Sequence, residues 1–104
     1  MITHVNEISF DKAIKIHKVC LVDFFATWCG PCRMLAAELE DATEQNSKLE
    51  VLKVDIDECY NLAEKFQIEV VPTMIIFVDG KPVKQLQGYL NSQELLKIIE
   101  PYLN

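Results

Sequence analysis

The chain has 104 residues, half of them hydrophobic and a quarter charged, so we expect a single domain over residues 1–104 with a core of its own. Its formal net charge of −6 disfavours a nucleic-acid partner, because a phosphate backbone would repel it. No apolar run approaches the ~20 residues of a membrane helix, and no basic segment leading into an apolar one marks a secretion signal. We therefore expect no membrane partner and a cytoplasmic location.

The first elements in the chain are short. Residues 2–5 alternate in polarity, which predicts an edge strand. Ser9 is predicted to cap a helix, because a side-chain oxygen at that point can accept from a free helix N–H. The apolar positions of this helix, at helical spacing, are Phe10, Ala13, Ile14 and Ile16. His4 and His17 have no neighbours at ligand spacing, so we expect surface residues and no metal site.

Residues 19–26 form a nearly continuous apolar run, typical of a strand that is buried on both faces of a sheet. Asp23 interrupts this run. A buried carboxylate is unfavourable unless it is paired, hydrogen-bonded or protonated. It is either an aspartate satisfied by neighbouring backbone or, as we favour, a proton acceptor whose pKa burial raises. Cys20, in the same run, is expected to be a small core residue.

Two cysteines, Cys29 and Cys32, follow this strand directly and flank Gly30 and Pro31. Proline is tolerated at the first positions of a helix, so the pair is predicted to lie at a helix start. Free N–H groups and the positive end of the helix dipole there favour a Cys29 thiolate, which is the nucleophilic form. Cys32, one turn away, can displace a partner bound to Cys29, so the pair can alternate between dithiol and disulfide.

Three other interpretations of the cysteine pair are weaker. A structural disulfide across so short a loop restrains the unfolded chain little. A zinc site needs four ligands, and no second Cys-x-x-Cys or paired histidine follows. Two inert buried cysteines do not explain the Gly-Pro pair at a helix start. In a chain without an export signal, a redox function is favoured.

The middle of the chain predicts a helix and a second buried strand. Residues 33–46 have an apolar face formed by Leu35, Leu39 and Ala42, which predicts an amphipathic helix packed on the sheet. Residues 51–56 read as a buried strand, in which Lys53 needs a carboxylate partner or a route to water. Asp23 is the natural partner, whereas a lysine stem that reaches the sheet edge is the alternative.

The last third predicts a helix, a hairpin and a final helix. Residues 57–66 are polar and then helical. Cys59 lies near the start of this predicted helix, so we expect it to be more reactive than Cys20. Residues 74–78 form a strand, Asp79-Gly80 a hairpin turn, and residues 82–87 an edge strand because Pro82 cannot donate a ladder hydrogen bond. The final helix is capped by Asn91 or Ser92, and Pro101 is expected to end or bend it near Glu100. Its expected inward residues are Leu95, Leu96, Ile99 and Leu103.

Alternating strands and helices indicate an α/β fold, and the closing hairpin makes the sheet mixed. Three motifs at matching spacing resemble the thioredoxin family over nearly the whole chain: residues 22–32 its active-site signature, residues 53–57 its third strand, and residues 71–73 its cis-proline loop. The resemblance implies the thioredoxin fold, with five strands in the order 1-3-2-4-5 and helices on both faces.

The resemblance also implies an activity. The chain is expected to be a cytosolic protein disulfide reductase in which Cys29 attacks, Cys32 resolves, Asp23 moves the proton and Lys53 lies beside Asp23. An NADPH-dependent reductase would recycle it, so no bound cofactor is expected, and the chain is expected to be a monomer that acts on protein disulfides. Gly30 and Pro31 would tune the redox chemistry. The expected docking rim, the residues that would contact a substrate, consists of Trp28, Gly30, Pro31, Val71, Pro72 and Gly88.

The chain departs from the family pattern at three positions. Ala37 replaces a helix-kinking proline, so we expect a straighter helix. Val70 and Tyr89 replace small residues beside the expected groove. Two alternative functions remain: an oxidase or isomerase, which the absent export signal disfavours, and a redox-independent interaction module or scaffold.

Overall fold

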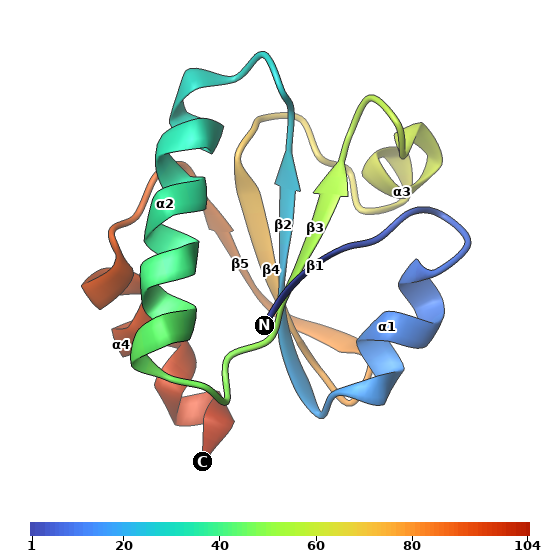
Figure 1. Ribbon diagram of the computed structural model, residues 1–104. Helices are drawn as coiled ribbons and strands as arrows, with labels where there is room; N and C mark the ends of the chain where they lie inside the picture. The colour runs from blue at the N-terminus through green and yellow to red at the C-terminus, as the bar shows by residue number, and fades with distance from the viewer.

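A mixed sheet of five strands forms the centre of the fold in the computed structural model, which describes residues 1–104 (Figure 1). The strands are β1 (Ile2–His4), β2 (Val19–Phe25), β3 (Val51–Asp55), β4 (Thr73–Val78) and β5 (Lys81–Gln87). Their order is β1-β3-β2-β4-β5. Strands β1, β3 and β2 are parallel, whereas β4 is antiparallel to both β2 and β5. The predicted fold class and strand order are confirmed.

Four helices cover the two faces of the sheet. They are α1 (Phe10–Ile16), α2 (Gly30–Gln45), α3 (Tyr60–Lys65) and α4 (Ser92–Leu103). Figure 1 shows α2 and α4 on one face and α1 and α3 on the other. Each face has its own buried apolar cluster, with Phe10, Ile14 and Leu62 on the α1–α3 side and Leu35, Leu39, Ala42, Leu95, Leu96 and Ile99 on the α2–α4 side.

Strand β2 lies in the middle of the sheet, and its side chains alternate between the two clusters. Cys20, Val22 and Phe24 pack on the α1–α3 side, and Val19 and Leu21 on the α2–α4 side. This burial on both faces explains the continuous apolar run in the sequence.

The β4–β5 hairpin closes the sheet with a two-residue turn. Asp79 and Gly80 have φ angles of 52° and 79°, and positive φ at both residues is the mark of a type I′ turn. Strand β5 is the edge strand, as predicted from Pro82. Pro82 pairs with Phe77, but the next residue to pair is Lys84, so Val83 is an extra residue on the edge.

The first helix corrects two predictions. Ser9 makes no side-chain capping bond to α1. Asn6 instead stabilises the turn that leads into α1. Its carboxamide oxygen accepts from the N–H groups of Ile8 and Ser9, both at 2.9 Å, and its backbone carbonyl accepts from the N–H of Phe10 at 3.0 Å. Ile16, expected on the inner face, is 63% exposed because it lies at the last position of a seven-residue helix.

The last helix confirms one prediction and corrects another. Asn91 caps α4: its side chain accepts from the N–H of Glu94, and the Glu94 carboxylate accepts from the N–H of Asn91. The helix does not end near Glu100 but continues through Pro101 to Leu103. Pro101 removes one intrahelical hydrogen bond and crowds the carbonyl four residues before it, but it lies in the last turn, so it does not end the helix. Leu103 is half-buried, whereas the other three expected inward residues are buried.

Candidate functional site

Two loops meet at the carboxyl end of β2, and their meeting follows from the sheet. The first loop leaves β2 after Phe25 and leads to α2. The second contains Val71–Pro72 and leads into β4. Because β4 is antiparallel to β2, with Thr73 opposite Phe24, the start of β4 lies at the end of β2. Segments about 40 residues apart are therefore neighbours.

Cys29 is the N-cap of α2 and forms a disulfide with Cys32. Its sulfur also accepts a hydrogen bond from the Cys32 N–H at 3.2 Å. Pro31 occupies the first turn of the helix, as the sequence predicts. The first turn of the helix has no acidic residue, and the helix dipole and the free N–H groups favour negative charge on the Cys29 sulfur. The cysteines are 5% and 2% exposed, so both are nearly buried in the disulfide form.

The Val71–Pro72 peptide bond is cis, as the resemblance implies. The Val71 carbonyl oxygen lies 3.7 Å from the Cys29 sulfur. On the other side of the loop, the Gly88 N–H donates to the Pro72 carbonyl at 2.8 Å. Gly88 has a φ of 86°, a backbone conformation that residues other than glycine rarely adopt. The cysteine loop, the proline loop and Gly88 are thus brought together.

Trp28 projects beside the cysteines and is 66% exposed. Its indole N–H donates to an Asp57 carboxylate oxygen at 2.9 Å. Asp57 was not predicted to be a site residue. A polar residue two positions after the end of a buried strand was the available signal, because strand ends are where side chains reach such sites.

The Asp23 carboxylate is fully buried on the same face of the sheet as α2. Lys53 lies opposite it in the β2–β3 pairing, with its Nζ 3.5 Å from an Asp23 oxygen. No backbone N–H donates to either Asp23 oxygen, so the aspartate is not satisfied by neighbouring backbone. Burial raises the pKa of Asp23 to about 6, and the nearby Lys53 charge only partly opposes this effect.

Lys53 both pairs with Asp23 and borders a hollow that leads outward. Only 8% of Lys53 is exposed, and its ammonium lies 4.5 Å from the centre of the Phe25 ring. Cys32, Arg33 and Lys53 are among the residues that line a hollow of about 230 Å³. Lys53 and Cys32 therefore border one space.

The two other cysteines are free and buried. Burial raises the pKa of the Cys20 thiol to about 11. Burial, together with the charge of Glu7, also raises the pKa of Cys59, which is 1% exposed. Both free thiols are therefore held in their unreactive protonated form, and whether Cys59 is more reactive than Cys20 stays a prediction.

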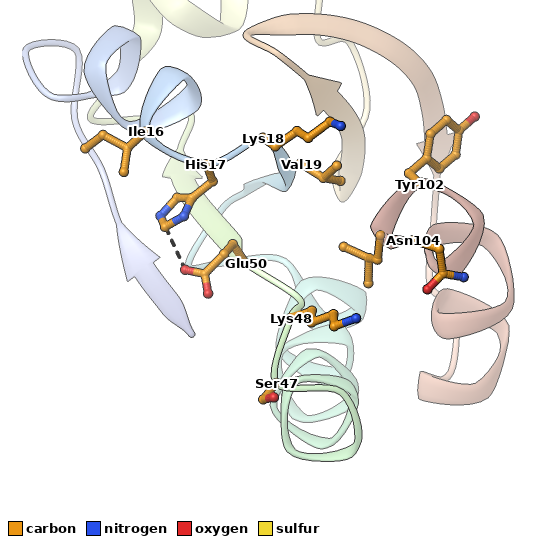
Figure 2. Close-up of a pocket in the computed structure, with 10 residues that line it drawn as sticks. Ile16, His17, Lys18, Val19, Ser47, Lys48, Glu50, Tyr102 and Asn104 are labelled. Atoms are coloured by element: carbon orange, nitrogen blue, oxygen red, sulfur yellow. Dashed lines mark ion pairs between the residues drawn. The ribbon is translucent and has the colours of Figure 1, made fainter.

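The largest hollow in the structure, about 460 Å³, lies at the other end of β2 (Figure 2). Val19 and Glu50 line it, and His17 forms an ion pair of 3.3 Å with Glu50. It contains none of the residues predicted to act in the site. No group of three or more His, Cys, Asp or Glu side chains is arranged to hold a metal ion, and none of the four helices has the length and apolar composition of a membrane span.

Known proteins share both the sequence and the fold. The family model described as Thioredoxin matches residues 1–101. The chain belongs to the thioredoxin family. It is 43% identical to the thioredoxin of Staphylococcus saprophyticus and 41% identical to that of Staphylococcus haemolyticus, each over 103 residues that cover 98% of both chains.

Solved structures of the family agree with the fold. A structure of a mutant thioredoxin from Halobacterium salinarum superposes with a TM-score of 0.92 at 35% identity, covering 99% of this chain and 91% of that one. The thioredoxin of Plasmodium falciparum gives 0.87 at 36% identity, covering 96% and 98%. The chain is a thioredoxin-family thiol–disulfide oxidoreductase with the redox-type cysteine pair Cys29–Cys32.

Proposed function

We propose that the protein is a cytosolic protein disulfide reductase that an NADPH-dependent thioredoxin reductase recycles. The observation that carries the proposal is the Cys29–Cys32 disulfide at the start of α2, 3.7 Å from the carbonyl of a cis-proline loop. An exposed aromatic residue and an open backbone segment beside a disulfide suit the docking of an extended substrate chain. The docking rim defined above supplies these contacts.

In the reduced protein, the Cys29 thiolate attacks one sulfur of a substrate disulfide. A bond forms between Cys29 and the substrate, the substrate S–S bond breaks, and the departing sulfur takes up a proton. Cys32 then loses its proton and attacks the Cys29 sulfur, which forms the internal disulfide and releases the second substrate thiol. Two electrons pass from the protein to the substrate, and the reductase returns two electrons to the protein.

Asp23 takes the Cys32 proton in this scheme. The positive charge of Lys53 limits the rise of the Asp23 pKa, so that the carboxyl group can still ionise near neutral pH. A pKa of about 6 suits a proton acceptor near neutral pH. Cys32 and Lys53 line the same hollow, which supports a role for the Lys53–Asp23 pair beside Cys32. Gly30 and Pro31 set the helix start and thereby tune the stability of the thiolate.

An insulin-reduction assay with dithiothreitol tests the proposal, and a variant with serine at both Cys29 and Cys32 is the control. We expect the wild-type protein to accelerate insulin precipitation and the variant to match dithiothreitol alone. A second assay follows NADPH consumption with a thioredoxin reductase. Equal rates for wild type and variant in both assays would contradict the redox function and favour the interaction module.

A further inference from the structure

Three carboxylates, those of Asp57, Glu69 and Glu38, lie near residues of the docking rim. Asp57 holds Trp28 through its indole N–H. Glu69 is exposed two residues before Val71. Glu38 accepts a hydrogen bond of 2.8 Å from the Ser92 N–H, just beyond the Gly88 end of the rim. Each carboxylate therefore lies next to a different part of the surface on which a substrate would dock.

The charge of these three groups is not neutralised within the protein. The ion pairs in the structure involve Glu50 and Asp23, and none involves Asp57, Glu69 or Glu38. Burial and the nearby charge of Glu38 raise the pKa of the Tyr89 hydroxyl, which is consistent with a negative field at that end of the rim.

Positive charge at the cysteines is sparse. Arg33 follows Cys32, and one of its guanidinium nitrogens donates to the Thr27 carbonyl at 3.0 Å. Lys53 is nearly buried and paired with Asp23. The three carboxylates therefore outweigh the free positive charge around the disulfide, so this surface is negative. The whole chain also has a net charge of −6.

We propose that the docking rim favours substrate segments in which lysine or arginine flanks the disulfide. The proposal rests on the reductase function proposed above and names the chemical class of its substrates. Complementary charge raises the rate of encounter, and like charge suppresses the wrong partners. Acidic segments around a disulfide are therefore poor substrates for this chain.

Glu69 is the carboxylate on which the proposal is best tested. Asp57 and Glu38 each hold a neighbouring structural group, so replacing them would disturb the site. Glu69 makes no side-chain hydrogen bond or ion pair and is exposed, so Glu69→Gln and Glu69→Lys change charge with little effect on the fold. Glu44 is the matched control: it is also exposed and unpaired, and it lies 14 residues along α2 from Gly30, about 21 Å away along the helix.

The probes are three synthetic peptides of one length, each closed by one disulfide, with lysine, glutamine or glutamate at the flanking positions. Single-turnover rates are measured with the pre-reduced protein. At about 0.01 M ionic strength we expect the lysine peptide to react about tenfold faster than the glutamate peptide, with glutamine between them. At about 1 M the difference should largely disappear, because the Debye length falls from about 30 Å to about 3 Å.

The variants then locate the effect. Glu69→Gln should reduce the lysine-to-glutamate rate ratio about threefold, Glu69→Lys should reduce it further, and Glu44→Gln should leave it unchanged. Equal rates for the three peptides at low salt, or an equal response to Glu44→Gln and Glu69→Gln, would overturn the proposal while leaving the reductase function intact. A failure to reduce even the glutamine peptide would instead contradict the reductase function on which the proposal rests.

Discussion

The surroundings of the two sulfurs differ, and this difference assigns their roles. The Cys29 sulfur lies at the helix N-cap, receives an N–H and faces the Val71 carbonyl, whereas Cys32 lies deeper beside the hollow that it shares with Lys53. We expect Cys29→Ser to abolish turnover. Cys32→Ser should instead accumulate a mixed disulfide with the substrate, because nothing resolves it. Intact-protein mass spectrometry distinguishes the two results.

Alkylation of the reduced wild-type protein near neutral pH is the independent check on this assignment. Cys29 should react first, because the helix start stabilises its thiolate. Peptide mapping that finds Cys32 modified before Cys29 would reverse the roles.

The buried Asp23 carboxylate is expected to destabilise the fold at neutral pH. Its pKa rises from 3.8 to about 6 on folding, so below pH 3.8 it is protonated in both states and has no effect. As the pH rises from 3.8 to 6, the unfolded chain ionises while the folded chain does not, and stability falls. The full difference is equivalent to about 3 kcal/mol.

Asp23→Asn removes this effect. We expect the variant to gain about 1–3 kcal/mol in the free energy of unfolding at pH 7, and to release the mixed disulfide more slowly because the proton acceptor is lost. Urea melts from pH 3.5 to pH 7 should show the gain growing across that range. Glu44→Gln is the exposed control; a variant less stable than wild type at pH 7 would contradict the burial argument.

Individual residues were predictable where their chemistry conflicts with their surroundings. Asp23 and Lys53 stand out in the sequence because each is a charge inside an apolar strand, and the structure brings them together. Asp57 was not predicted, because its role depends on how the loop after β3 folds back to Trp28. The position of Asp57 just after a buried strand marks it as a candidate site residue, but that position does not identify Trp28 as its partner.

Helix α3 depends on a residue from a distant loop. The Glu7 carboxylate accepts from the N–H groups of Asn61 and Leu62, at 2.7 and 3.2 Å, and so replaces a local cap. Cys59, the N-cap residue, makes no side-chain bond of its own to the helix. Glu7→Ala should therefore lower the free energy of unfolding by about 1–2 kcal/mol in urea melts. Glu58→Ala, an exposed residue without such bonds, should change it by less than about 0.5 kcal/mol.

Two large side chains, Val70 and Tyr89, lie next to the proline loop and Gly88 in the sequence, at positions where the family pattern has small residues. Val70 and Tyr89 are 49% and 40% exposed, so neither is in the core. We predict that a thioredoxin reductase from an unrelated source will reduce this protein poorly, although dithiothreitol reduces it normally. Val70→Gly with Tyr89→Ala should raise kcat/KM for that reductase about tenfold, since bulk that clashes with a wrong partner is removed. Unchanged steady-state kinetics in the double variant would show that the groove does not select partners.

Element types were predictable from periodicity, whereas their ends were less so. The apolar faces of α2 and α4 and the buried strands agree with the structure, because burial dictates those patterns. The start of α1 depends instead on the turn that Asn6 stabilises, and the first N–H groups of α3 bind Glu7, more than 50 residues away in sequence. Whether the helix with Ala37 is straighter than in relatives stays a prediction.

The two free cysteines lie in the same apolar cluster, on the α1–α3 side of the sheet. We expect Cys20 and Cys59 not to pair, because the raised pKa of each thiol keeps it in the unreactive form. Thiol counting on oxidised and then denatured monomer should find two free cysteines. Finding none would refute this prediction.

The whole fold was predictable only with the resemblance. Alternating strands and helices indicate an α/β sheet, but periodicity does not say which strands are neighbours. In the structure, β3 lies between β1 and β2, so the chain order and the spatial order differ. Because the cysteines follow β2, its central position places them between the ends of its two neighbours, β3 and β4.

Strand β5 also affects how copies of the folded chain meet in a concentrated solution. Six of its seven residues are exposed, and its outer backbone groups have no partner strand. Lys81, Lys84, a proline without an N–H and the extra Val83 all interrupt that edge. The opposite edge, β1, has only three residues. Neither edge is long, flat and apolar enough to template strand-by-strand growth, so the folded protein is protected against assembly into extended sheets.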